Sequence, residues 1–218
     1  MASRRKPAAA ASSVAVPRES GNRELSARAQ ATRARVIRAA LECIKEQGHL
    51  YASSNEIARR AEVSWGVIQY HFGTRDGILM AVVEDGFSRL RGKLQAVEVD
   101  SPDIEDRLRA VVDAIWEYHS QPEYLLYTDI LRSLRRDETW LDLLEPSLRR
   151  IDDELAEIWS RILEPVMPRA VSSRSVQHLI FATTRGLAVT RSLREDERLF
   201  TEEREMLVRA LAALLREQ

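Results

Sequence analysis

The apolar positions of this chain recur at the three- and four-residue spacing of an α-helix over most of its length. The first such stretch begins near Ser26, and Gly48 is placed to end it. Its apolar face consists of Val36, Ile37, Ala40, Leu41 and Ile44. This spacing predicts an amphipathic first helix with one buried side.

Two short helices are predicted directly after it, with only a tight turn between them. Ser53 followed three residues later by Glu56 is typical of a capping box, so a helix should begin there. Ser64 is placed to cap the next helix, in which Ile68 and Phe72 share the core-facing side. Together these features predict a helix-turn-helix unit.

Beyond residue 75 no stretch shows the two-residue alternation of a strand, so the fold class is predicted to be all-α, with about nine helices. The later helices are expected near 75–97, 103–119, 122–136, 138–164, 173–195 and 201–216. Pro146 falls inside one of them and predicts a kink or a new start. The expected domains are a disordered basic tail (1–24), a three-helix DNA-binding domain (25–80) and a larger helical domain for effector binding and dimerisation (81–218).

The net charge of −1 over 218 residues hides a division of charge along the chain. Residues 1–75 carry 13 Lys and Arg against 6 Asp and Glu, whereas the remainder carries 20 against 28. A basic front part suits contact with phosphates, and the alternative is chance clustering on solvated helix faces.

Other function classes find little support in the sequence. The single cysteine, Cys43, excludes an internal disulfide and fits a reducing compartment. No apolar run approaches the roughly 20 residues that cross a bilayer, so a cytoplasmic protein without membrane contact is expected. No Ser-His-Asp, Glu-x-x-His or phosphate-loop spacing is present, and the histidines at 49, 71, 119 and 178 are scattered. We therefore expect no enzyme, no cofactor and no metal site.

The second helix of a helix-turn-helix unit enters the major groove and presents its outward residues to base edges. Gln69 is suited to pair with adenine and Trp65 to contact a thymine methyl group or the sugar backbone, while Gly66 permits close approach. The alternatives are local packing or a solvated surface. The predicted DNA contacts are Ser53, Ser64, Trp65, Gly66, Gln69, Tyr70, His71 and Arg75.

The segments TRARVIRAALECIKEQG and SSNEIARRAEVSWGVIQYHFGTRDGIL resemble the N-terminal domain of the TetR family of bacterial transcriptional regulators, from about Ala29 to Glu84. The resemblance implies DNA-contact roles for the residues just named. Glu62 stands where the family usually has a turn glycine, a change that costs about 1 kcal/mol if the position is left-handed. Gln69 replaces a more usual aromatic residue and Arg75 the usual lysine, so the operator sequence stays open.

A single helix-turn-helix unit reads few base pairs, so a two-fold homodimer is expected to address an inverted repeat with half-sites roughly 34 Å apart. The predicted dimer interface comprises Ala182, Gly186, Leu207, Leu211 and Leu214. Packing within one subunit is the alternative explanation for these residues.

Large rings in the rear part suggest an apolar pocket for a small-molecule effector. The candidate residues are Trp116, Tyr127, His178, Phe181 and Arg185, each of which is also a plausible core or surface residue. Arg185 lies in an apolar helix and must find an acidic ligand, a protein carboxylate or solvent.

The sequence thus predicts a dimeric repressor that a small molecule releases from double-stranded operator DNA. An activator or a regulator without a ligand would have the same sequence features. A third hypothesis is a helical adaptor whose helix-turn-helix unit packs against another protein.

Overall fold

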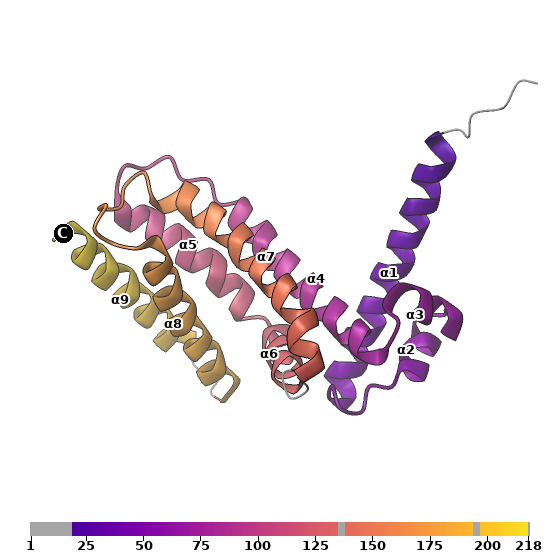
Figure 1. Ribbon diagram of the computed structural model, residues 1–218. Coiled ribbons are helices and arrows are strands. Elements are labelled where there is room, and N and C mark those ends of the chain that lie inside the picture. Colours follow the sequence, from indigo (N-terminus) through magenta and orange to yellow (C-terminus); the bar gives the residue numbers. More distant parts are fainter. Residues whose placement is uncertain (1–18, 135–137, 194–196, 218) are drawn as a thin grey trace, which may run out of the picture.

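The computed structural model describes residues 19–134, 138–193 and 197–217, and every regular element within these ranges is an α-helix (Figure 1). The helices are α1 Glu19–Gln47, α2 Ser54–Arg60, α3 Trp65–Phe72, α4 Arg75–Gln95, α5 Ile104–His119, α6 Pro122–Leu134, α7 Glu138–Leu163, α8 Ser173–Leu193 and α9 Glu197–Arg216. The all-α prediction is confirmed. No helix in the described part of the chain is both long enough and apolar enough to cross a membrane.

Helices α1 to α3 and the beginning of α4 form a head at one end of an elongated molecule (Figure 1). Helix α4 continues without a break past the predicted domain boundary at residue 80, and it packs against α1 and α3 as well as α5, α6 and α7. Helices α8 and α9 lie side by side at the far end, and both pack against α5. Helix α4 is therefore the structural link between the head and the body.

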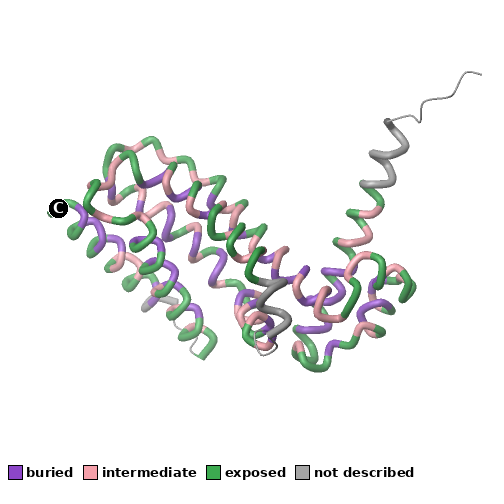
Figure 2. Tube along the Cα trace, viewed as in Figure 1, coloured by how far each residue is buried: buried purple, intermediate pink, exposed green. Residues whose placement is uncertain are grey.

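The helical spacing of the sequence correctly predicted the core of the head. All five apolar residues expected to face inward from α1 are buried, as are Ile57 of α2 and Ile68 of α3. Figure 2 shows how buried positions recur along one side of the helices. Cys43 is fully buried among them, and this burial raises the pKa of its thiol. Cys43 is therefore a packed core residue, as its position beside the apolar stripe predicted.

Helix α1 begins at Glu19, seven residues before the predicted start near Ser26. The predicted tail (1–24) thus overlaps the helix, while residues 1–18 lie outside the described residues. The prediction relied on apolar spacing, which starts only at Val36. Residues 23–35 are instead rich in Ala and Arg, which favour a helix by intrinsic propensity without forming an apolar face.

Helix α7 runs through Pro146 as one helix, so the alternative of a new helix start at this proline is wrong. Proline costs the helix one hydrogen bond of the ladder and introduces a clash with the preceding turn. The chain is helical on both sides of Pro146, and Pro146 itself is exposed.

Side-chain caps fix the start of α2 and α4. Ser53 Oγ accepts a hydrogen bond from the Glu56 amide at 3.2 Å, and Thr74 Oγ1 accepts one from the Gly77 amide at 3.1 Å. A Cβ atom at Gly77 would lie 1.9 Å from the carbonyl oxygen of Phe72. Glycine at position 77 therefore allows the end of α3 and the start of α4 to approach closely.

The turn between α2 and α3 contains a non-glycine residue with a left-handed backbone. Glu62 has φ +52°, which makes it the one non-glycine residue with positive φ among the described residues. Its side chain is exposed and makes no ion pair with a described residue. The strain expected at Glu62 from the sequence is thus present in the backbone.

Glu62→Gly should raise the free energy of unfolding by about 0.5–1 kcal/mol, because glycine adopts this conformation without a Cβ clash. Urea denaturation of the purified protein measures the change. Glu62→Gln is the matched control, since it removes the charge but keeps the Cβ atom. If the Gly and Gln variants unfold at the same urea concentration, backbone strain at residue 62 is negligible.

Candidate nucleic-acid interface and ligand cavity

Helix α3 has one face in the core and the opposite face in solvent. Ile68 is fully buried, whereas Tyr70 is 84% exposed and Trp65 46% exposed. Gly66 and Gln69 are exposed on the same side of the helix. The structure therefore brings four of the predicted DNA-contact residues together on one accessible surface.

The other predicted contact residues lie around α3, and they differ in whether their polar groups already have a partner within the protein. Ser64 is the N-cap residue of α3 but makes no side-chain cap bond, so its hydroxyl remains accessible. The Ser53 hydroxyl is occupied by the Glu56 amide. His71 is half-buried between two rings, with its centroid 5.0 Å from that of Tyr70 and 6.1 Å from that of Phe72.

Arg75 is engaged within the protein. Its Nε donates a hydrogen bond to the carbonyl oxygen of Ala52 at 2.8 Å, and its Nη2 donates to the carbonyl oxygen of His49. A third contact joins it to Asp76 at 3.5 Å. The guanidinium thus fixes the loop between α1 and α2 to the start of α4. Contact of Arg75 with a DNA phosphate stays a prediction.

The basic residues of α2 are also paired. Arg59 and Arg60 both donate to Glu56, and together they lower the pKa of this carboxyl to about 2. Arg60 further donates to Glu46 of α1 at 2.6 Å. The positive charge of α2 is therefore largely neutralised by neighbouring carboxylates.

Unpaired positive charge in the head lies on α1 instead. Arg28, Arg35 and Arg38 are exposed and form no ion pair with any residue the structure describes. They lie opposite the buried stripe of the helix, so helical spacing indicates their position, although we did not single them out from the sequence. Tyr51, which is 76% exposed in the loop before α2, is another accessible residue that the sequence motif did not identify.

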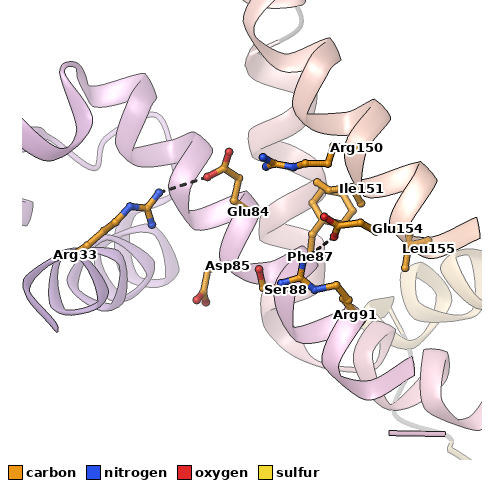
Figure 3. Close-up of a pocket in the computed structure, with 10 residues that line it drawn as sticks. All are labelled: Arg33, Glu84, Asp85, Phe87, Ser88, Arg91, Arg150, Ile151, Glu154 and Leu155. Carbon is orange, nitrogen blue, oxygen red and sulfur yellow. Dashed lines mark hydrogen bonds and ion pairs between the residues drawn. The ribbon is translucent and has the colours of Figure 1, made fainter. Parts of the chain in front are cut away.

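Arg33 of α1 contacts both α3 and α4. Its guanidinium lies 5.4 Å from the ring centroid of Phe72, the last residue of α3, and 3.4 Å from the carboxylate of Glu84 in α4. Figure 3 shows Arg33 and Glu84 facing each other across one side of a cleft. Arg33 therefore ties the end of the exposed helix to α4.

The cleft beside Arg33 has a volume of about 350 Å³ and lies between α1, α4 and α7 (Figure 3). An ion pair between Arg91 of α4 and Glu154 of α7, 2.6 Å long, closes its other side. Phe87 and Leu155 line this cleft, and the same two residues also line a second cavity between α4, α6, α7 and α8. The two spaces are thus separated by a shared wall.

The second cavity has a volume of about 430 Å³. Three of the predicted effector residues, His178, Phe181 and Arg185, line it. The other two lie elsewhere in the core. Trp116 stacks on Phe200 at 5.8 Å between centroids, and buried Tyr127 stacks on Tyr118 at 6.5 Å.

A buried polar cluster lies next to Phe181 of this cavity. The His119 ring contacts Phe181 at 5.6 Å between centroids, and Trp159 contacts it at 6.0 Å. Burial first, and the charge of Arg185 second, lower the pKa of His119 to about 3. Thr184 Oγ1 donates to the Ile180 carbonyl at 2.7 Å, so Nδ1–H of the neutral His119 donates to Thr184 at 2.9 Å. Nε2 of His119 then has no partner among the described residues.

Helices α8 and α9 leave an apolar surface exposed at the far end of the molecule. On α8, Leu179, Ala182, Gly186, Val189 and Leu193 follow a three-and-four spacing and are all exposed. Met206 and Leu214 are exposed on α9 and Leu207 is half-buried, whereas Leu211 is buried in the subunit's own core. Of the five predicted interface residues, Leu211 therefore lies apart from this face.

No group of His, Cys, Asp and Glu side chains within the described ranges is arranged to hold a metal ion.

Comparison with known proteins relates the chain to regulators of transcription. The family model described as bacterial regulatory proteins, tetR family, matches residues 36–82. The uncharacterized HTH-type transcriptional regulator TtgW of Pseudomonas putida is 34% identical over 122 residues, which cover 55% of this chain and 86% of that protein. The HTH-type transcriptional regulator CymR of Pseudomonas putida is 22% identical over 173 residues, or 79% of this chain and 85% of CymR.

A solved structure shares the fold over most of the chain. The transcriptional regulator FadR from Bacillus subtilis, crystallised in complex with stearoyl-CoA, superposes with a TM-score of 0.56 at 19% identity, covering 84% of this chain and 96% of FadR. The match extends well beyond the head, so the arrangement of the body helices is also that of a known fold.

We predict that Arg33→Met weakens DNA binding about fivefold. The half-exposed ion pair with Glu84 and the contact with Phe72 each stabilise the packing of the end of α3 by about 0.5–1 kcal/mol, and part of this energy is lost from DNA binding when Arg33 is replaced. Fluorescence anisotropy with the duplex that the wild-type protein selects measures the dissociation constant.

Glu84→Gln separates positioning from simple charge attraction. Removing a carboxylate strengthens binding if Arg33 serves only to neutralise a phosphate, but we expect it to weaken binding, because Arg33 loses the group that holds it. Asp85→Asn is the matched control, since Asp85 lines the same cleft but pairs with Arg89. Equal effects of the two acid-removing variants would rule out a positioning role.

Proposed function

The chain belongs to the TetR family of bacterial regulatory proteins, and on this premise we propose that it represses transcription as a homodimer bound to an inverted repeat until a small molecule releases it. DNA binding through a helix-turn-helix unit is the activity of its family. For this chain we propose the dimer, the direction of regulation and the residues that contact DNA.

The observation that carries the proposal is the exposed side of α3. A tyrosine that is 84% exposed and a tryptophan that is 46% exposed lie on the same side of this eight-residue helix, and aromatic side chains gathered on one surface in this way favour a contact site. Gln69 lies on the same side and has the amide geometry that pairs with adenine in the major groove. We assign base contact to Gln69 and Trp65, with Gly66 allowing the backbone to approach.

Phosphate contact is assigned to groups on either side of α3. Ser64 and Tyr70 offer hydroxyl groups, and Ser53, His71 and Arg75 are secondary candidates because each already has a partner or a packed ring. The exposed arginines of α1 add the charge that α2 lacks, since Arg28, Arg35 and Arg38 form no ion pair with described residues. Contacts of this kind make affinity strongly dependent on salt.

The exposed face of α8 and α9 supports a two-fold dimer. Its apolar residues match the spacing of a helix that packs against a partner helix, and small residues at 182 and 186 permit close approach. A self-complementary face of two helices from each subunit forms a four-helix bundle. Ala182, Gly186, Leu207 and Leu214 are the proposed interface residues.

The cavity beside Phe181 supports an effector site. Its volume lies within the range of about 300–1,000 Å³ that is usual for small-molecule pockets, and it combines apolar walls with the polar side chains of Gln177, His178 and Arg185. Binding there that favours one position of α4 would change the separation of the two heads. A coupling of about 1–3 kcal/mol is sufficient for regulation.

Selection from random duplex DNA by the purified full-length protein tests the proposed sequence-specific DNA binding. We expect enrichment of an inverted repeat, with affinity that falls as salt is raised. Gln69→Ala should lose about 1–3 kcal/mol of preference at one base position, or roughly fivefold to a hundredfold. Gln95→Ala, an exposed glutamine at the end of α4, is the control and should leave the selected sequence unchanged.

Failure to enrich any duplex would favour the helical adaptor, in which α3 packs against a protein. A reporter gene with the selected repeat across its promoter then separates repression from activation. Expression that falls when the protein is supplied supports a repressor, and expression that rises contradicts it.

Gly186→Arg should abolish the dimer without unfolding the subunit. A Cβ atom at Gly186 meets nothing within 4 Å in the subunit, and arginine favours helix over glycine by up to about 1 kcal/mol. Sedimentation velocity should show twice the mass of one chain for the wild type and a single chain for the variant. Gly92→Arg on α4 is matched in surroundings and should remain dimeric. A dimeric Gly186→Arg variant would place the interface elsewhere.

A further inference from the structure

Arg185 is a cation without a carboxylate partner at the edge of an apolar cavity. Its guanidinium lies 5.4 Å from the ring centroid of Phe181, and it forms no ion pair with any described residue. Asp152 lines the same cavity without pairing with it. Arg185 is exposed at the edge of the cavity, so its guanidinium donors can reach an anion bound there.

The charge of Arg185 acts on the interior of the body. It opposes the effect of burial on the pKa of Tyr118 and Tyr124, and adds to the effect of burial on the pKa of His119. Asp152 has no such influence on these three buried groups. Arg185 is thus the one charge of the cavity lining that acts on the pKa of all three of these buried groups.

A second polar group in the cavity also lacks a partner. Gln177 lines the cavity from α8, is 8% exposed, and makes no side-chain hydrogen bond with a described residue. Its amide atoms are not among the fully buried polar atoms that lack a partner, so the amide reaches the open space of the cavity. The Gln177 amide supplies both donors and an acceptor within the same space as Arg185.

The remaining wall is apolar and the space is small. Phe87, Leu131, Leu155 and Phe181 line it, and its volume of about 430 Å³ lies near the lower end of the range for small-molecule pockets, which suits a compact ligand. Arg185 balances one negative charge, and the carboxylate of Asp152 in the same lining would repel a second one, which disfavours phosphates and dicarboxylates. The lining therefore matches a compact apolar body that carries a single carboxylate.

We propose that this cavity binds a compact apolar monocarboxylate, with the carboxylate paired to Arg185, its second oxygen or a ring substituent bonded to Gln177, and its body against Phe181, Phe87 and Leu155. The assignment of this molecule as the effector rests on the proposed function above. Binding itself does not, because none of the residues that line the cavity belongs to α3.

Isothermal titration calorimetry with 2-naphthoate and its neutral counterpart 2-naphthamide tests the proposal on the full-length protein. The two probes share shape and apolar surface, and they differ in charge. We expect naphthoate to bind at least tenfold more tightly, because a hydrogen bond to a charged group exceeds a neutral one by about that factor. Equal binding of the two, or no binding of naphthoate, would overturn the proposal.

Arg185→Gln should remove the preference for naphthoate and leave naphthamide binding unchanged. Arg174→Gln is the matched control, because Arg174 is also exposed on α8 but does not line the cavity. Arg185 is exposed, so its replacement leaves the core intact, and circular dichroism confirms that the variant folds. A preference that survives in Arg185→Gln, or is lost equally in Arg174→Gln, contradicts the assignment of Arg185.

The selected operator duplex then distinguishes the two proposals. Naphthoate should lower the affinity of the wild type for this duplex and have no effect on Arg185→Gln, which should still bind the duplex. Tight naphthoate binding with unchanged DNA affinity would overturn the effector assignment. A chain that selects no DNA but prefers naphthoate would overturn the proposed function and leave the carboxylate site standing.

Discussion

Burial of α4 along its whole length is the interaction on which the rest of the molecule depends. Its first half is packed against α1 and α3, and its second half against α5, α6 and α7, with Ile78, Leu79, Leu90 and Leu94 all inaccessible to solvent. Because packed interiors resist local compression, a displacement at one end of such a helix is transmitted along it. The head therefore has no orientation that is independent of the body.

Charge in the head is distributed so that structure and recognition use different arginines. Arg60 and Arg75 fix the short helices and the loop before α2, and their positive charge is shared with carboxylates or carbonyl groups. Arg28, Arg35 and Arg38 of α1 are exposed and form no ion pair with described residues. Most of the basic excess of residues 1–75 belongs to the sequence before α1, and these exposed arginines are the part of it that the structure places in the head.

Helical spacing predicted most of the fold, because the buried face of a helix follows directly from the spacing of apolar residues in the sequence. The buried stripe of α1 and the solvent face of α3 followed from it, and the strain at Glu62 followed from a missing glycine. The start of α1 was missed, because propensity rather than an apolar face decides it. Contacts between distant segments, such as Arg33 with Phe72, depend on tertiary packing and leave no local pattern. For the same reason ring content could not separate Phe181 in the cavity from Trp116 in the core.

The wall that Phe87 and Leu155 form between the two cavities has a thermodynamic consequence. Filling one space presses on side chains that also bound the other, beside the ion pairs that hold α1 and α7 to α4. Any coupling carried by this wall is reciprocal, so DNA that favours one position of α4 changes affinity for a ligand by the same factor as the ligand changes affinity for DNA. A cell with many operator copies would then require more ligand for half-saturation than one with few.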